Sequence, residues 1–172
     1  MPIKSTLSKK LCHIGIGSNL ANELGEPTDH VKQAIDWLTN HPNFDDFCVS
    51  SLYTSKAFGV TDQPDFINAV AKFCTDLSAL TVLDILQDFE QQAKRVRLRR
   101  WGERSLDLDL LTYGDEKIDN ERLTVPHIGI FERNFVVIPM LEISPEIVIH
   151  GQAVKNLEIA NNHQGLTKIS NV

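Results

Sequence analysis

Short apolar runs, separated by longer polar segments, predict several β-strands in this chain. Each run holds about four to eight mostly apolar residues and is bounded by glycine, proline or polar residues, as strands usually are. The runs span residues 11–17, 47–53, 66–73 and 106–113. After the last run, Gly114 and Asp115 are expected to turn the chain into a hairpin whose second strand lies near Ile118.

Two other segments have the spacing of amphipathic helices. Pro27 favours a helix start, and the apolar residues after it recur at i, i+4 and i+7, which predicts a helix that ends near Asn40. Ser78 is expected to cap a second helix. Pro139 disfavours a central strand over 135–143 and leaves a short helix as the alternative. One or two helical turns are expected over 154–160.

The resulting order, β, α, β, β, α, β, predicts an α+β fold. Its natural form is a ferredoxin-like βαββαβ core, in which helices flank a mostly antiparallel sheet. The 172 residues suit one domain, and no repeat or linker-like tract divides them. We therefore expect an N-terminal tail over 1–10 and a single domain over 11–172.

The composition narrows the functional classes. A hydrophobic content of 42% with 23% charged residues is typical of a globular protein and excludes disordered and collagen-like chains. The net charge of −6 does not favour nucleic acid as a partner. The three cysteines form no Cys-x-x-Cys pair, so a disulfide framework is not expected. No signal peptide or membrane-spanning stretch is seen, and a reduced, cytoplasmic setting is the expectation.

A pair of carboxylates is the sharpest chemical feature. Asp107 and Asp109 are two apart in a predicted strand, so they share one face while the leucines between and beside them point into the core. Such a pair needs cations or a metal to compensate its charge, and oxygen ligands suit Mg²⁺. A solvent-facing pair on an edge strand is the alternative.

A basic segment precedes that strand. Residues 94–104 hold six of the 17 lysines and arginines, against one acid, Glu103. Arginine forks match phosphate oxygens, so this segment and the carboxylates supply both halves of a magnesium–polyphosphate site. A solvated charged face is the alternative. In a separate segment, Phe66 and Asn68 would offer an aromatic face and an amide to a heteroaromatic ring.

Four segments together resemble one known family. They are GIGSNL from Gly15, QPDFINA from Gln63, RVR from Arg95 followed by RWGERSLDLD from Arg100, and RLTVPH from Arg122. Over residues 11–149 the chain resembles the 6-hydroxymethyl-7,8-dihydropterin pyrophosphokinases. The resemblance implies a ferredoxin-like fold and transfer of pyrophosphate from ATP to the pterin hydroxymethyl group, which releases AMP. That reaction is a step of folate biosynthesis.

The resemblance also implies roles for individual residues. Asp107 and Asp109 are the implied ligands of two Mg²⁺ ions and, with Arg95 and Arg104, the implied catalytic residues. The implied ATP contacts are Gln87, Arg97, Arg100, Trp101, Leu110, Arg122, Thr124, His127 and Arg133. The implied pterin contacts are Ser55, Phe58, Phe66, Asn68, Trp101 and Phe135.

The chain departs from the family pattern at Glu103, Ser105 and Ile128, and segment 54–59 lacks a common proline. Either Arg99 or Arg100 corresponds to one arginine of the family pattern. A paralogue acting on a related pterin alcohol, a ferredoxin-like RNA-binding module and a metal-dependent phosphohydrolase are therefore the alternatives. The expected partners are ATP and the pterin, without nucleic acid or membrane. The length favours a monofunctional enzyme, and a monomer is expected.

Overall fold

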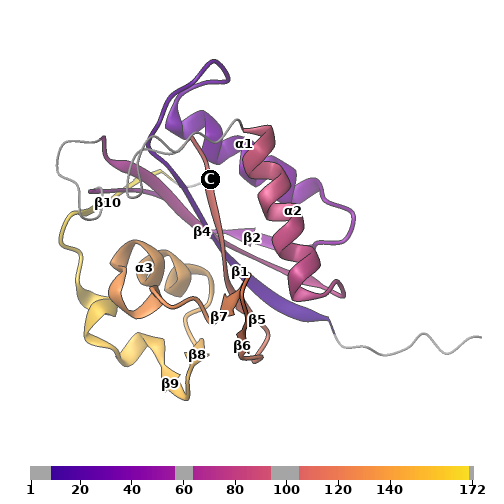
Figure 1. Cartoon of the computed structure of the whole chain (residues 1–172). Helices are drawn as coiled ribbons and strands as arrows, with labels where there is room; N and C mark the ends of the chain where they lie inside the picture. The colour runs from indigo at the N-terminus through magenta and orange to yellow at the C-terminus, as the bar shows by residue number, and fades with distance from the viewer. Residues whose placement is uncertain (1–8, 57–63, 94–104, 171–172) are drawn as a thin grey trace, which may run out of the picture.

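The fold is that of a computed structural model, which describes residues 9–56, 64–93 and 105–170. An antiparallel sheet with the order β10-β3-β4-β1-β5 forms its centre, and β2 also pairs with β4 (Figure 1). Its strands are β1 (Lys10–Ser18), β2 (Asp45–Val49), β3 (Leu52–Ser55), β4 (Phe66–Thr75), β5 (Asp107–Tyr113) and β10 (Leu166–Ser170). The order β3-β4-β1-β5 is that of a ferredoxin-like core, so the predicted α+β fold is confirmed.

Three helices pack on this sheet (Figure 1). They are α1 (Pro27–Asn40), α2 (Ala79–Gln92) and α3 (Asn134–Ile143). The N-terminal signals act as predicted: Pro27 opens α1, and the Ser78 hydroxyl accepts a hydrogen bond from the Thr81 N–H at the start of α2. The short helix offered as the alternative for 135–143 is confirmed, with Pro139 inside it.

Strand alternation divides the core into two layers. On β1, Cys12, Ile14 and Ile16 are buried in the larger layer, beneath α1 and α2. Leu106, Leu108 and Leu110 join the same layer, as the sequence predicted. The opposite face of the sheet packs against α3 through Val70 and Leu111. The residues between the core leucines of β5 therefore face the α3 side.

The structure corrects three expectations about strands. The predicted strand over 47–53 is broken, because the buried Ser50 and Ser51 separate β2 from β3. Ser50 instead exchanges hydrogen bonds with Val70 on β4. The residues near Ile118 form β6 (Ile118–Asp119), which pairs with β7 (Thr124–Val125) and not with β5. Strand β10, which no apolar run predicted, completes the sheet beside β3.

Smaller elements complete the described chain. After α3, β8 (Val148–Ile149) pairs with β9 (Gln152–Ala153). Short 3₁₀ turns over Ile130–Glu132, Val154–Asn156 and Glu158–Asn161 follow β7 and β9, and the last two match the helical turns expected there. Within the described ranges, no helix has the length and apolarity needed to cross a membrane.

Candidate active site

Two glycines on β1 form the floor of the candidate site. In the antiparallel register, Gly15 is paired with Asp109 and Gly17 with Asp107 on β5. On the other side of β1, Gly17 is paired with Asn68 on β4. Because glycine has no side chain, this part of the sheet lies open between the carboxylates and the amide. The β1 register therefore brings together residues from three separate sequence segments.

A cavity of about 190 Å³ lies over this floor. The implied site residues that line it are Ser55, Phe66, Asn68, Asp107, Asp109, His127, Arg133 and Phe135. Lys56 and Val136 line it as well, and neither was expected from the sequence. The cavity thus combines the implied pterin contacts with the implied metal ligands. The predicted sharing of one strand face by Asp107 and Asp109 is confirmed.

The amide of Asn68 is oriented by Ser55. Asn68 Nδ2 donates a hydrogen bond to Ser55 Oγ at 2.5 Å, and both residues are buried. The Oδ1 atom of Asn68 lies on the Gly17 side, since it is the atom nearest to the position of a β-carbon on Gly17. Ser55 therefore acts on the site through Asn68, besides lining the cavity itself.

The aromatic and cationic walls come from two elements. Phe66 begins β4, and Phe135 lies in the first turn of α3. The Arg133 guanidinium lies 5.9 Å from the centre of the Phe135 ring, which is within cation–π range. The cavity therefore presents two aromatic side chains and a cation to a ligand.

His127 presents a neutral ring to the cavity. Burial lowers the pKa of His127, the Arg133 charge lowers it further, and Asp107 opposes both. The Nδ1 atom accepts a hydrogen bond from the Gly129 N–H at 3.1 Å, so the neutral ring carries its proton on Nε2. The His127 N–H donates to the Leu111 carbonyl at 2.9 Å, which holds this segment against β5. His127 therefore offers Nε2–H as a donor.

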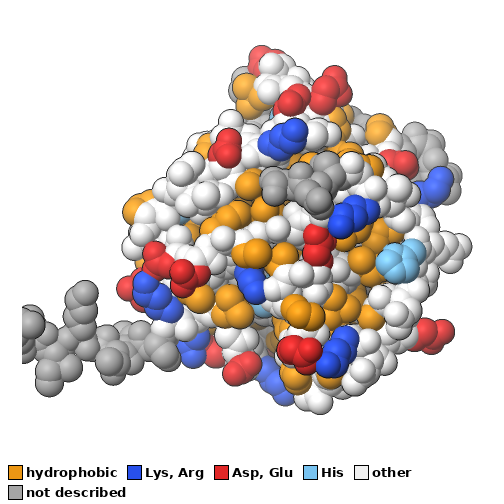
Figure 2. All heavy atoms as spheres, turned by 180° about the vertical axis from the view of Figure 1, so that it is seen from behind, with side chains coloured by type: hydrophobic (Ala, Val, Ile, Leu, Met, Phe, Trp, Pro, Cys, Tyr) orange, Lys and Arg blue, Asp and Glu red, His pale blue; other side chains and the backbone are white. Residues whose placement is uncertain are grey.

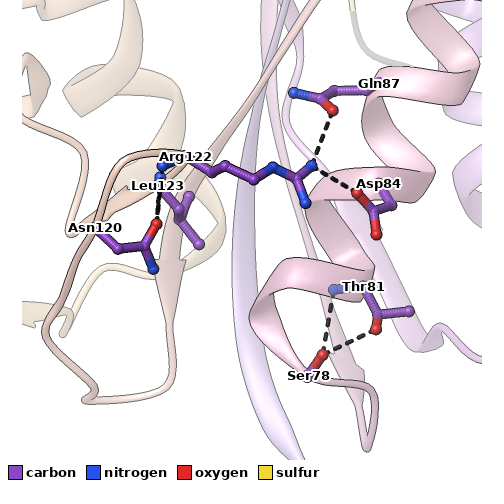
Figure 3. Close-up of polar contacts among 7 residues, drawn as sticks. All are labelled: Ser78, Thr81, Asp84, Gln87, Asn120, Arg122 and Leu123. Atoms are coloured by element: carbon purple, nitrogen blue, oxygen red, sulfur yellow. Dashed lines mark hydrogen bonds and ion pairs between the residues drawn. The ribbon is translucent and has the colours of Figure 1, made fainter.

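A second group of implied ATP contacts lies outside the cavity lining. Arg122, in the loop between β6 and β7, donates from Nη2 to Gln87 Oε1 on α2 at 3.2 Å (Figure 3). The same nitrogen donates to Asp84 Oδ1 at 2.6 Å. Thr124 follows on β7, where its hydroxyl contacts Asp119 at 3.3 Å. Arg122 and Gln87 therefore meet at α2, whereas the side chain of Thr124 contacts Asp119 on β6.

Leu110 differs from the other implied ATP contacts. It is 2% exposed and belongs to the core layer under α1 and α2, so its side chain points away from the cavity. An ATP contact at this position would have to use the backbone. Six other implied residues lie outside the part of the chain that the structure describes: Phe58, Arg95, Arg97, Arg100, Trp101 and Arg104.

The donor set fits magnesium. Within the described ranges, no group of three or more His, Cys, Asp or Glu side chains forms a protein-only metal cage. Mg²⁺ is commonly held by one or two carboxylates together with water and substrate phosphates, and does not need such a cage. Asp107 and Asp109 on one face of β5 match that requirement.

Side chains of both charges lie on the face of the molecule that is turned away in Figure 1. On the face shown in Figure 2, the coloured Lys and Arg side chains are interspersed with Asp and Glu. A protein that follows a phosphate backbone needs a basic stripe or patch. The described part of that face shows no such stripe, and residues 94–104, which hold six of the 17 lysines and arginines, lie outside the described ranges.

Comparison with known proteins places the chain in one family. The model of the family 7,8-dihydro-6-hydroxymethylpterin-pyrophosphokinase (HPPK) matches residues 13–145. A Haemophilus influenzae protein named 2-amino-4-hydroxy-6-hydroxymethyldihydropteridine pyrophosphokinase is 47% identical over 137 residues, which are 80% of this chain and 83% of that protein. A Pseudomonas aeruginosa protein of the same name is 37% identical over 91% of this chain and 95% of its own length.

A solved structure supports the fold independently. A Plasmodium falciparum HPPK-DHPS structure with pteroate superposes with a TM-score of 0.67 at 10% identity. The match covers 91% of this chain and 41% of that longer one, and at this identity it speaks for the fold alone. The family model and the bacterial relatives settle the assignment: the chain belongs to the 7,8-dihydro-6-hydroxymethylpterin-pyrophosphokinase family.

Proposed function

We propose that the cavity over β1 holds 6-hydroxymethyl-7,8-dihydropterin and that the chain transfers the β,γ-pyrophosphoryl group of ATP to its hydroxymethyl oxygen. The products are AMP and the dihydropterin pyrophosphate, in a step of folate biosynthesis. One observation carries the proposal: Gly17 is the register partner of both Asn68 and Asp107. An amide suited to a pterin edge and a carboxylate suited to a metal therefore flank one open position.

The pterin half of the site is assigned to the side chains on β4, β3 and α3. Asn68 would read the hydrogen-bonding edge of the ring with the amide that Ser55 orients. Phe66 and Phe135 would pack against the ring. Phe58 and Trp101 are proposed for the same pocket from the family resemblance.

The metal half of the site is assigned to Asp107 and Asp109. When bound there, Mg²⁺ would supply positive charge that offsets the negative charge of the triphosphate oxygens. Two ions are proposed. The two carboxylates would hold them at the cavity floor, and Asp107 is also proposed to accept the proton of the attacking hydroxyl.

The remaining polar residues would bind and neutralise ATP. His127, through Nε2–H, and Arg133 are proposed to contact phosphate oxygens beside the carboxylates. Gln87, Arg122 and Thr124 would bind the nucleotide. Arg95 and Arg104 are proposed to neutralise the transferred group, and Arg97, Arg100 and Leu110 to contact ATP.

The proposed setting follows from the thiols. All three cysteines, Cys12, Cys48 and Cys74, are free, which suits a reducing cytoplasm. Burial raises the pKa of the Cys12 thiol to about 12, so this cysteine serves as a core residue and not as a nucleophile. A monomer built as one domain over 11–172 is proposed as the acting unit.

The test is an assay with ATP, Mg²⁺ and the pterin, in which AMP is followed by chromatography. We expect AMP only when the pterin is present, in equal amount to the pterin pyrophosphate. Release of inorganic phosphate without the pterin would indicate a phosphohydrolase instead. Absence of AMP in a protein that binds ATP, followed by turnover with another pterin alcohol, would identify a paralogue.

A further inference from the structure

The side chain of Arg122 is fixed at one corner of its guanidinium group (Figure 3). Its Nη2 donates to Asp84 Oδ1 at 2.6 Å and to Gln87 Oε1 at 3.2 Å. Asp84 and Gln87 are three residues apart on α2, so they project from the same side of the helix. Two acceptors therefore hold a single nitrogen.

The backbone of Arg122 is held as well. Asn120 Oδ1 accepts hydrogen bonds from the N–H groups of Arg122 at 2.9 Å and Leu123 at 3.0 Å. This side-chain turn sets the direction in which Arg122 leaves the β6–β7 loop. The loop and the helix together restrict the Arg122 side chain to few conformations.

Most of the guanidinium stays available. It has five N–H groups, of which Nη2 supplies two, and no described residue accepts from Nε or Nη1. The Arg122 side chain is 46% exposed, so these remaining donors can reach solvent. Asp84 and Gln87 thus orient the group without consuming its capacity to bind an anion.

The loop that carries Arg122 is linked to the strand of the proposed metal ligands. Strand β7 continues into His127, whose N–H is bonded to Leu111 on β5, the strand that carries Asp107 and Asp109. Strand β5 ends the sheet order, so the loop of Arg122 lies at the same sheet edge as the metal-binding carboxylates. A polyphosphate held by those carboxylates has a route around this edge to Arg122.

We propose that Asp84 is a positioning residue for ATP: it holds the Arg122 guanidinium against α2 and leaves three of its N–H donors free of described partners. The inference rests on the proposed function, since it takes Arg122 as an ATP contact. An arginine side chain loses much rotamer freedom when it binds, and Asp84 removes part of that freedom before ATP arrives.

The test compares two Asp→Asn variants on one helix. Asp84→Asn weakens the ion pair. Asp88→Asn removes the same charge at a side chain that, among the described residues, bonds Gln92 at 2.9 Å and not Arg122. For Asp84→Asn we expect the KM for ATP to rise about two- to fivefold, the range of exposed ion pairs, with kcat and the pterin KM unchanged. Asp88→Asn should match the wild type in all three.

A double-mutant cycle separates positioning from a general effect on the helix. In an Arg122→Ala background, Asp84→Asn should leave the KM for ATP unchanged, because its target is gone. An equal rise in both backgrounds would overturn the proposal. A lower KM in Asp84→Asn would also overturn it, since Asp84 would then be withholding Arg122 from ATP.

Direct binding of a non-hydrolysable ATP analogue with Mg²⁺ keeps this test independent of turnover. If the wild type makes no AMP with the pterin, the proposed function fails, and the dissociation constants of the two variants still decide the role of Asp84. If the wild type is active and the two variants bind the analogue equally, only the role of Asp84 is rejected.

Discussion

Asn68 and Gly17 are register partners across β4 and β1, and a β-carbon on Gly17 would stand 3.3 Å from Asn68 Oδ1. The same β-carbon on Gly15 would meet nothing closer than 3.5 Å, at Leu111 Cδ2. The two glycines of the cavity floor therefore differ. A methyl group at position 17 must displace the amide, whereas one at position 15 makes an ordinary contact.

Gly17→Ala should therefore weaken pterin binding. Asn68 is tied to Ser55 at 2.5 Å, so it cannot yield to the new methyl group without changing that bond. We expect the pterin KM to rise about tenfold, the equivalent of one hydrogen bond of about 1.4 kcal/mol. The comparison is with Gly15→Ala by steady-state kinetics, and equal pterin KM values in the two variants would contradict the role given to Gly17.

Asp107→Asn and Asp109→Asn should each abolish most of the turnover. Each substitution keeps the shape of the side chain but removes a carboxylate charge that Mg²⁺ requires. A loss of at least about a hundredfold in kcat is expected, the range seen when transition-state charge loses one stabilising group. The variants should unfold at the wild-type temperature. Turnover close to that of the wild type in either variant would remove the metal assignment.

Stability should fall as the solution becomes acidic, partly through His13. This side chain is 2% exposed, and its ring nitrogens contact Thr112 Oγ1 at 2.7 Å and Ser144 Oγ at 2.8 Å. Burial, with a smaller contribution from the Lys72 charge, lowers the pKa of His13 from 6.5 to about 4. The unfolded chain therefore binds the proton more readily between these values, and unfolding is favoured as the pH falls from 6.5 toward 4.

The measurement is urea unfolding at pH 7 and at pH 4.5, and the variant is His13→Gln. Each pKa unit is worth about 1.4 kcal/mol, so His13 should account for an acid loss on the order of 3 kcal/mol that the variant does not show. The control is His163→Gln, which removes an exposed imidazole. Between pH 7 and pH 4.5, its free energy of unfolding should fall by as much as that of the wild type. The same acid loss in wild type and His13→Gln would reject the explanation.

Glu142 on α3 should stabilise the junction between α3 and β3. Its carboxylate accepts hydrogen bonds from the Ser51 N–H at 3.0 Å, the Ser51 hydroxyl at 2.5 Å and the Tyr53 hydroxyl at 2.7 Å. Burial opposes ionisation of Glu142, but these bonds outweigh it and lower its pKa. Glu142→Ala should cost about 1–2 kcal/mol in the free energy of unfolding, because Ser51 is buried and loses its acceptor.

Glu146→Ala is the matched control for this change. The Glu146 side chain is 79% exposed and, within the described part of the chain, pairs with Lys155, so its loss should cost less than about 0.5 kcal/mol. Thermal or urea unfolding of the two variants gives the comparison. Equal losses would mean that the bonds from Ser51 and Tyr53 to Glu142 add nothing to stability.

Much of the fold was predictable because its signals are local. Helix α1 begins at Pro27 and ends at Asn40 as the spacing predicted, and Ser78 caps α2. Alternation placed Leu106, Leu108 and Leu110 in the core. Caps and periodicity act over a few residues, so they can be read without knowledge of any partner segment.

The errors concern pairing between segments. The strand near Ile118 pairs with Val125 across its own loop instead of extending a hairpin with β5. In strand β10, the buried Leu166 is followed by the exposed Thr167, Lys168 and Ile169, so the strand lacked an apolar run. Edge strands need only one pairing side and one anchoring residue, and their sequences are correspondingly weak signals.

The candidate site shows the same contrast between what local sequence predicts and what long-range pairing decides. The residue types were visible in the sequence: the carboxylates of Asp107 and Asp109, the amide of Asn68 and the imidazole of His127. Sequence spacing alone, however, placed neither Asp107 beside Gly17 nor the guanidinium of Arg122 beside Asp84, 38 residues away. Helix formation and strand alternation depend on neighbours along the chain, whereas strand register and long-range ion pairs depend on how all the elements pack together, and these contacts exist only in the folded molecule.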